Sequence, residues 1–460
     1  MMPYESKELL RSALGLAPDH SPFPWQAGLL EKMCQGELPD ALDIPTGLGK
    51  TSVMAIWLVA RVLGASVPRR MVYVVDRRAV VDQATEVAIA LREWIEQNAD
   101  LKTNLGLTDR LLPISTLRGQ YADNREWLEN PSAPAIIVGT VDMVGSRLLF
   151  EGYGVSRKMR PYHAGLLGVD TLLVLDEAHL APPFEHLLRA IATDPFFRPH
   201  DPQCASCIPS FKLLALTATG RAHGGNTLRL TPDDFNHNIL NKRLCAKKSL
   251  CLVALDKDAK LEDALATQAW ALKGDGKQGV RVIVYSDSRE VAQKAREAVK
   301  KLAKGDKKEG TAIKIDTELF VGARRVFERE HAKKRLEELG FIAGAEIERT
   351  CPSFLFATSA GEVGVDLDAD HMVCDLVAWE RMVQRFGRVN RRGEPEGHIA
   401  QVVVLVPPEP RPDRKTQEAL DKQAPNAKLD DKEEKRLKEH ERKVQEWKAR
   451  QAPLERLPRG

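Results

Sequence analysis

The sequence predicts an α/β protein with two tandem lobes, each a parallel sheet flanked by helices, followed by a charged helical C-terminal tail. Short apolar runs that end in a turn or a polar cluster occur in two separate sets, and helical patterns separate them. Strands that alternate with helices favour parallel sheets with right-handed crossovers. Hydrophobic residues make up 43% of the 460 residues, which is enough for a core in each lobe.

The expected strands of the first lobe are 71–76, 135–139, 171–176 and 212–217. A helix is expected over 78–94, because apolar residues recur there at helical spacing. The expected strands of the second lobe are 281–285, 353–357, 371–375 and 401–406. We therefore predict a first lobe over residues 1–230 and a second over residues 231–407.

The composition changes after Pro407. Four prolines within 407–412 stop the sheet, and residues 411–460 contain 26 charged residues. Leu437, Val444 and Trp447 give only a thin apolar stripe. We predict that residues 408–460 form a charged helix or linker, with a docking or nucleic-acid-binding helix as the alternative.

Charge and cysteine content exclude several classes of protein. The net charge of +3 gives no general positive field, so any nucleic-acid contact must come from a local stripe. Seven scattered cysteines exclude a disulfide scaffold and favour a reducing compartment. The first ten residues lack the apolar core of a secretory signal, and the longest apolar stretch, 52–66, contains Arg61 and is too short for a membrane span. We expect a cytoplasmic protein without membrane contact.

A glycine-rich turn before an apolar helical run predicts a phosphate-binding loop. Backbone N–H groups of such a turn point at phosphate oxygens, and the helix adds its positive N-terminal end. Lys50 would reach the β and γ phosphates of ATP, and the Thr51 hydroxyl would hold Mg²⁺. Ile44 stands where the strict pattern has glycine. The predicted ATP-binding residues of the turn are Pro45, Thr46, Gly47, Leu48, Gly49, Lys50 and Thr51.

An acidic pair follows the expected strand 171–176. The carboxyl ends of parallel strands are where ligands bind in open α/β sheets. Asp176 would hold Mg²⁺ and Glu177 would polarise the attacking water. His179, two positions further on, would couple the nucleotide site to the second lobe.

Two arginines in the segment 384–393 predict a second part of the catalytic site. Arg388 and Arg391 are three residues apart, which places both on one face of a helical turn. Guanidinium groups suit the charge that develops on a transferred phosphoryl group, and they can come from a second lobe.

Together these motifs resemble a known family. Segments 45–51, 176–179, 217–219 and 384–391 resemble, in this order, those of superfamily 2 helicases of the DEAH-box kind. Segments 75–83, 139–143 and 384–393 resemble the CRISPR-associated helicase of type I interference systems, in its I-U (I-G) branch. The resemblance covers about residues 23–406 and implies two RecA-like lobes with ATP between them and a single strand across both.

The resemblance also implies roles for individual residues. Gln26 would read adenine, and Asp366 would contact the nucleotide. Arg388 and Arg391 would act as arginine fingers. The coupling residues would be His179, Thr217, Thr219 and Gln384, and the nucleic-acid backbone would be contacted near Arg78, Thr140, Ser286 and Thr358.

The expected function is a nucleic-acid-dependent ATPase that works as a helicase or translocase on single-stranded DNA. By resemblance, a guide-RNA surveillance complex would expose that strand. Contacts to phosphates do not detect the ribose 2′-OH, so they do not distinguish DNA from RNA. RNA therefore remains an alternative substrate. The alternatives are a DEAH-type RNA helicase, a DNA-repair helicase, or an inactive adaptor that docks on a surveillance complex.

Nuclease activity is not expected from this chain. The family usually pairs the motor with an HD nuclease, which needs several His and Asp ligands, and the chain offers only His200-Asp201. An HD domain would then lie on another chain or beyond Gly460. Cys204 and Cys207 are one half of a zinc-site pattern, but Cys245 and Cys251 are too loosely spaced to favour a zinc site.

Overall fold

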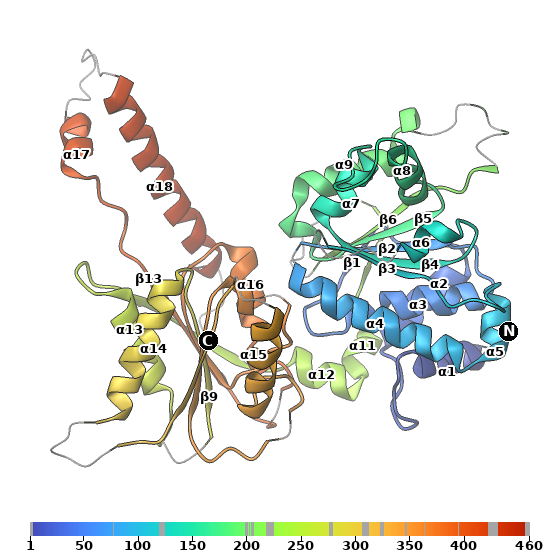
Figure 1. The fold of residues 1–460 in the computed structure, drawn as a ribbon. Helices are drawn as coiled ribbons and strands as arrows, with labels where there is room; N and C mark the ends of the chain where they lie inside the picture. The colour runs from blue at the N-terminus through green and yellow to red at the C-terminus, as the bar shows by residue number, and fades with distance from the viewer. Residues whose placement is uncertain are drawn as a thin grey trace. The chain divides into compact units, whose positions relative to one another are not determined.

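The computed structural model describes residues 3–455 in two compact units, Met1–Leu244 and Cys245–Gly460 (Figure 1). The first unit extends beyond residue 230 because α11 (Pro232–Asn236) packs against α2 (Pro24–Cys34). The backbone N–H of Trp25 also donates to Asp234 Oδ1 at 2.8 Å, which fixes α11 to α2. The gaps in the described range are residues 77, 119–124, 198–200, 202, 204–206, 218–224, 276–278, 306–311, 323–325, 346, 363, 394 and 422–430.

The first unit contains a sheet of parallel strands in the order β3-β4-β2-β5-β6-β1-β7. The four strands expected from the sequence are all present. β1, β3 and β7 are additional, and β1 places the phosphate-binding turn beside the end of β6. The bounds are Ala41–Asp43 for β1, Arg70–Val75 for β2, Ile114–Leu117 for β3, Ala135–Thr140 for β4, Thr171–Leu175 for β5, Lys212–Thr217 for β6 and Thr227–Arg229 for β7.

Helices cover both faces of this sheet (Figure 1). Alternate residues of β2 enter different cores: Tyr73 packs with α3 and α4, and Val74 packs with α7 and α9. The helices are α1 (Pro3–Ala13), α2 (Pro24–Cys34), α3 (Val53–Val62), α4 (Arg78–Glu96), α5 (Ala99–Asn104), α6 (Glu126–Glu129), α7 (Val141–Leu148), α8 (Arg160–Gly168), α9 (Pro182–Thr193), α11 (Pro232–Asn236) and α12 (Asn238–Leu244), with short 3₁₀ turns η1 (Lys50–Ser52), η2 (Ala178–Leu180) and η3 (Pro195–Phe197).

The second unit repeats the architecture with parallel strands in the order β10-β11-β9-β12-β13-β8. Helices α13 and α14 contribute to one core, and α15 and α16 to the other. The two parallel sheets flanked by helices confirm the predicted fold class. The bounds are β8 Lys248–Ala254, α13 Leu261–Ala271, β9 Arg281–Tyr285, α14 Arg289–Ala303, β10 Asp316–Phe320, α15 Val326–Glu338, β11 Ser353–Ala357, η4 Ser359–Gly361, β12 His371–Asp375, α16 Trp379–Phe386 and β13 Ala400–Val406.

The charged tail forms two helices, α17 (Arg414–Asp421) and α18 (Asp431–Glu455). The two helices pack against each other, and Ala419 and Leu437 are buried. The indole Nε1 of Trp447 donates to the backbone oxygen of Pro407 at 2.8 Å, so α18 is attached to the end of β13. The thin apolar stripe is therefore partly covered within the unit rather than solvated along its whole length.

Among the helices that the structure describes, none combines the length and the apolar character needed to cross a bilayer.

Candidate functional site

The phosphate-binding turn follows β1 at the carboxyl edge of the first sheet. Gly47 and Gly49 have φ angles of 85° and 77°, a left-handed conformation that strongly favours glycine. The backbone N–H of Ile44 donates to Thr217 O at 3.1 Å, which connects the start of the turn to the end of β6. Lys50 begins η1 and is 8% exposed, and the apolar helix α3 follows. Residues 45–51 thus form one continuous turn that leads into a helix.

The acidic pair lies beside this turn. Asp176 directly follows β5, and its backbone N–H donates to Val74 O at 2.8 Å. Lys50 Nζ lies 3.1 Å from Glu177 Oε1, although the two residues are 127 positions apart in the sequence. The structure therefore brings the lysine of the turn and the acidic pair together in one site.

Tyr73 connects the acidic pair to the turn, and sequence reasoning missed it. Its side chain is fully buried in β2, and its hydroxyl donates to Asp176 Oδ2 at 3.0 Å. The Thr51 side chain hydrogen-bonds to the same Tyr73 hydroxyl. Nothing in the local sequence marks Tyr73, because it reads as one more apolar residue of a buried strand. Only the pairing of β2 with β5 brings it to Asp176.

Burial and charge both disfavour a second negative charge here. Burial, and then the neighbouring Glu177 carboxylate, raise the pKa of Asp176 to about 6, although the Lys50 ammonium opposes this shift. Burial and then the charge of Asp176 also hold the pKa of Tyr73 well above its usual range. A cation beside Asp176 would relieve this cost.

The residues present fit a Mg²⁺ ion. Asp176 offers a carboxylate and Thr51 a hydroxyl, and hard oxygen ligands are those that Mg²⁺ prefers. Both groups hydrogen-bond to the single oxygen of Tyr73, so their side chains approach the same point. Burial and the neighbouring Glu177 carboxylate together outweigh the effect of the Lys50 ammonium on the pKa of Asp176, so a bound cation would offset them.

Glu177 and His179 occupy a constrained turn. Glu177 has φ 46°, a left-handed conformation that is uncommon for a residue with a side chain and that recurs at functional sites. His179 Nδ1 lies 3.5 Å from Glu177 Oε2, and the His179 side chain is almost completely buried. The imidazole thus lies beside the Glu177 carboxylate.

Gln26 lies next to the phosphate-binding turn. Its Oε1 accepts from the backbone N–H of Phe23 at 2.8 Å, and its Nε2 donates to Ser52 Oγ at 2.9 Å. Arg243, which no motif marked, donates from Nη1 to Gly47 O at 2.9 Å. Arg243 also stacks above the Phe23 ring with 5.9 Å between its Cζ and the ring centroid.

Thr140 and Thr217 lie along the same sheet edge. Thr140 ends β4, precedes α7 and is buried, and Thr217 ends β6 and is fully buried. Arg78 begins α4, but its side chain lies outside the described residues. Thr219 lies outside them completely.

In the second unit, Ser286 and Thr358 end neighbouring strands. Ser286 follows β9 and its backbone N–H donates to Ala357 O at 3.0 Å, and Thr358 follows β11. Both side chains are buried, and Ser286 Oγ donates to Asp375 Oδ2 at 3.4 Å. The two residues therefore share the carboxyl edge of this sheet.

Asp366 lies with both predicted arginine fingers. Arg388 Nη1 is 3.7 Å from Asp366 Oδ1, and Arg391 forms an ion pair with the same oxygen. Arg388 also donates to the backbone oxygen of Glu362 from Nε and Nη2. Gln384 is buried, and its Nε2 has no hydrogen-bond partner among the described residues.

A buried ion network holds these residues in place. Arg385 is fully buried, with Nε donating to Glu362 Oε1 at 2.8 Å and Nη1 donating to Asp375 Oδ1 at 2.7 Å. Arg381 makes a second ion pair with Glu362 at 2.8 Å. Sequence reasoning did not single out Arg385 or Asp375, although the position of Arg385 inside the segment 384–391 is a weak signal of such a role.

No further metal site emerges from the part of the chain that the structure describes, which holds no group of three or more His, Cys, Asp or Glu side chains arranged to bind a metal. Cys207, Cys245 and Cys251 are exposed and not disulfide-bonded. Cys204 and His200 lie outside the described residues.

Two family models match the chain. Residues 24–221 match the model described as DEAD/DEAH box helicase, and residues 277–394 match "CRISPR-associated nuclease/helicase Cas3, C-terminal". No curated protein matches the chain.

Solved helicase structures share the fold. Cas3 of T. fusca with ATP is 16% identical, with a TM-score of 0.59 over 97% of this chain and 55% of that one. The helicase Lhr of Mycobacterium smegmatis, bound to ssDNA and AMP-PNP, is 18% identical, with a TM-score of 0.53 over 100% of this chain and 57% of that one. The DUF1998 helicase MrfA, bound to DNA and AMPPNP, is 15% identical, with a TM-score of 0.56 over 96% and 57%.

The chain thus spans little more than half the length of these structures. The DEAD/DEAH match contains the phosphate-binding turn and the acidic pair, and the Cas3 match contains the two arginines. Residues 24–221 are therefore those of a DEAD/DEAH box helicase, and residues 277–394 match the C-terminal part of the CRISPR-associated nuclease/helicase Cas3.

Proposed function

We propose that this protein is an ATP-dependent helicase or translocase that works on single-stranded DNA. One observation carries the proposal: Lys50, Thr51, Asp176 and Glu177 converge at the carboxyl edge of the first sheet, with Tyr73 joining two of them. This arrangement suits a nucleoside triphosphate, because it combines a phosphate-binding turn with a carboxylate pair of different roles.

In this proposal the first lobe binds ATP and prepares the attacking water. Gln26 reads the adenine, and the backbone of residues 45–51 surrounds the phosphates while Lys50 contacts the β and γ phosphates. Thr51 and Asp176 hold Mg²⁺, which neutralises charge on the phosphates when it is bound. Glu177 accepts a hydrogen bond from the water and orients it toward the γ-phosphorus.

The second lobe supplies positive charge to the transferred phosphoryl group. Arg388 and Arg391 leave Asp366 and donate to the equatorial oxygens of the γ-phosphate, where charge develops. The Asp366 carboxylate keeps the two side chains oriented until nucleotide arrives, because it holds both by ion pairs. His179, Thr217, Thr219 and Gln384 transmit the nucleotide state between the lobes.

In this proposal, nucleic acid binds at the carboxyl edges of the two sheets. Thr140 and Arg78 in the first lobe, and Ser286 and Thr358 in the second, contact backbone phosphates, which are alike at every step and so permit movement along the strand. With each cycle of ATP binding and hydrolysis, the contacts of the first lobe and those of the second lobe hold the strand in turn.

The biological role that we propose is the motor of CRISPR type I interference. The match of residues 277–394 to the Cas3 C-terminal model supports it. A guide-RNA surveillance complex would supply the exposed strand. An HD nuclease, on this protein or another chain, would cut it. The presence of CRISPR repeats beside the gene is the simplest check of this context.

The direct test is ATP hydrolysis by the purified protein with and without single strands of equal sequence in DNA and RNA form. We expect stimulation by DNA of at least tenfold and weaker stimulation by RNA. Stimulation by RNA alone would favour the DEAH-type RNA helicase. Strand-independent hydrolysis would contradict a translocase, and the absence of hydrolysis under all conditions would favour an inactive adaptor.

A further inference from the structure

The segment after α7 presents two exposed aromatic side chains followed by a pair of basic ones. We call residues 149–159 the α7–α8 loop. Within it, Phe150 is 58% exposed and Tyr153 is 66% exposed, which is unusual for such large apolar groups. Arg157 and Lys158 are also exposed, and they come shortly after the aromatic residues. None of these side chains has a role in the proposed ATP site.

Three residues of this loop have left-handed backbone conformations, and its aromatic side chains are exposed to solvent. Phe150 has a left-handed φ of 61°, and Gly152 and Gly154 have φ angles of 59° and 71°. The first of these is strained for an aromatic residue. The conformation leaves Phe150 in solvent instead of in the core that Leu148, at the end of α7, enters.

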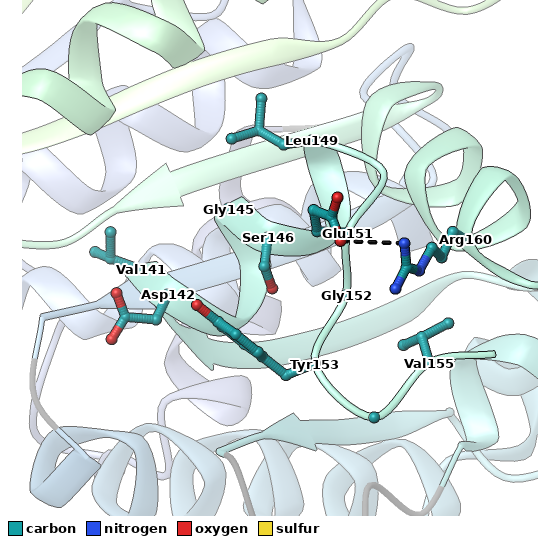
Figure 2. Close-up of a pocket in the computed structure, with 11 residues that line it drawn as sticks. Val141, Asp142, Gly145, Ser146, Leu149, Glu151, Gly152, Tyr153, Val155 and Arg160 are labelled. Atoms are coloured by element: carbon teal, nitrogen blue, oxygen red, sulfur yellow. Dashed lines mark ion pairs between the residues drawn. The ribbon is translucent and has the colours of Figure 1, made fainter. Parts of the chain in front are cut away.

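A pocket of about 580 Å³ lies between this loop and the first turns of α7. Figure 2 shows Tyr153 extending toward Asp142 and Ser146, with Leu149 and Val155 on the other walls. Glu151 forms an ion pair with Arg160 at 3.1 Å, so its negative charge is compensated. The pocket combines an aromatic face, aliphatic walls and a few polar groups.

The pocket adjoins the carboxyl edge of the first sheet. Its lining begins at Val141 and Asp142, immediately after Thr140 at the end of β4. The phosphate-binding turn and Asp176 lie at the ends of β1 and β5, on that same edge. A strand whose backbone contacts Thr140 would therefore lie next to residues that line this pocket.

We infer that the α7–α8 loop is a single-strand binding site in which one nucleobase stacks on Tyr153 while Arg157 and Lys158 contact the flanking phosphates. Single-strand binding proteins use this pairing of aromatic platforms with a basic path. Asp142 and Ser146 would hydrogen-bond to the edge of the base. The local cations are required because the whole chain, at +3, gives little general attraction for nucleic acid.

This inference rests on the proposed function, since it presupposes that the protein binds single strands. It adds a contact to the base itself, which the phosphate contacts do not provide. Stacking tolerates all four bases because each has a π face, so the site remains compatible with movement along any sequence.

The test measures binding of a fluorescent mixed-sequence DNA 20-mer to the full chain at several salt concentrations. Tyr153→Ala should weaken binding roughly tenfold, and Tyr153→Phe should restore it because the ring is kept. The salt dependence of Tyr153→Ala should equal that of the wild type. The double variant Arg157→Ala/Lys158→Ala should show a smaller salt slope, by about one for each phosphate that is no longer neutralised.

Two controls separate stacking from general damage. Phe197→Ala removes another exposed aromatic residue of the same unit and should bind DNA like the wild type. A 20-mer with abasic positions should bind the wild type and Tyr153→Ala equally, because no base is left to stack. Circular dichroism melting should give the same transition for all variants.

The outcomes distinguish the inference from the proposed function. If the wild type binds no single strand, both fail. If the wild type and Tyr153→Ala bind the strand equally well, the inference that a base stacks on Tyr153 is wrong. The exposed aromatic residues would then be candidates for contact with a partner protein. A tenfold loss for Tyr153→Ala that persists on the abasic strand would also overturn the inference.

Discussion

At the scale of single residues, Tyr73 sets the geometry of the acidic site although it has no part in the chemistry. Its hydroxyl is the meeting point of Asp176 and Thr51, the two groups that would hold Mg²⁺. Outer hydrogen bonds of this kind orient metal ligands, and their loss commonly weakens metal binding by about 10- to 100-fold.

Tyr73→Phe removes this hydroxyl without changing the packing of β2. We expect the Mg²⁺ concentration for half-maximal ATP hydrolysis to rise roughly tenfold. Binding of Mn²⁺ with ADP, followed by electron paramagnetic resonance, should weaken by a similar factor. Tyr162→Phe is the control, because Tyr162 donates to Leu128 O at 3.0 Å in the same unit. An equal shift in both variants would indicate a general effect on folding.

The pKa of Asp176 gives a prediction about stability and pH. A carboxyl whose pKa rises on folding, here to about 6, destabilises the fold progressively as the pH increases from below 4 to above 6. Asp176→Asn keeps the acceptor for Tyr73 and removes the charge. In the absence of Mg²⁺ and nucleotide, this variant should therefore melt at a higher temperature than the wild type at pH 7.5, and the two should converge near pH 4. A constant difference at every pH would contradict the assignment.

At the scale of elements, α16 connects three strands of the second unit through charge. Arg385 on α16 reaches Asp375 at the end of β12, and Glu362 after β11. Ser286, at the end of β9, is hydrogen-bonded to the same Asp375. Ser286 and the two predicted arginine fingers are therefore connected through one network of contacts centred on Glu362 and Asp375.

Arg385→Ala should destabilise the second unit by about 3–5 kcal/mol, because it leaves Glu362 and Asp375 buried without their main counter-charge. Arg381→Ala is a matched control, since Arg381 pairs with the same Glu362 but is 25% exposed. We expect about 1 kcal/mol or less for it. Denaturant unfolding measures both, and equal losses would show that burial does not decide the strength of the network.

The sequence predicted the longer buried strands and missed the short strands and the edge strands for a physical reason. β6, β9, β11 and β12 have the predicted bounds, since strands covered on both faces are continuous apolar runs. β8 was not predicted because it is an edge strand with exposed, partly polar residues, and β1 has only three residues.

The candidate site was predictable where chemistry is local to a motif. The turn at residues 45–51 and the pair Asp176 and Glu177 have fixed spacings, so the sequence alone points to them. Tyr73 and Arg385 act through contacts between elements that are far apart in the chain, and only the tertiary structure reveals those contacts.

At the scale of the whole molecule, hydrolysis should require both lobes. Arg388→Ala and Arg391→Ala should each lower turnover by roughly 10³-fold or more if they stabilise the transferred phosphoryl group. ATP affinity should change little, because the phosphate-binding turn is intact. Arg392→Ala, the next arginine in the segment, is the control. A loss below about tenfold in both variants would make them structural partners of Asp366.

The central claim is that Lys50 binds phosphate whereas Glu177 activates water. The most direct measurement compares ATP binding and single-turnover hydrolysis in Lys50→Ala and Glu177→Gln, with single-stranded DNA present. We predict that Lys50→Ala loses both ATP affinity and hydrolysis, and that Glu177→Gln keeps its affinity while hydrolysis collapses. Equal ATP affinity in the two variants, or hydrolysis by Glu177→Gln at the rate of the wild type, would contradict this claim.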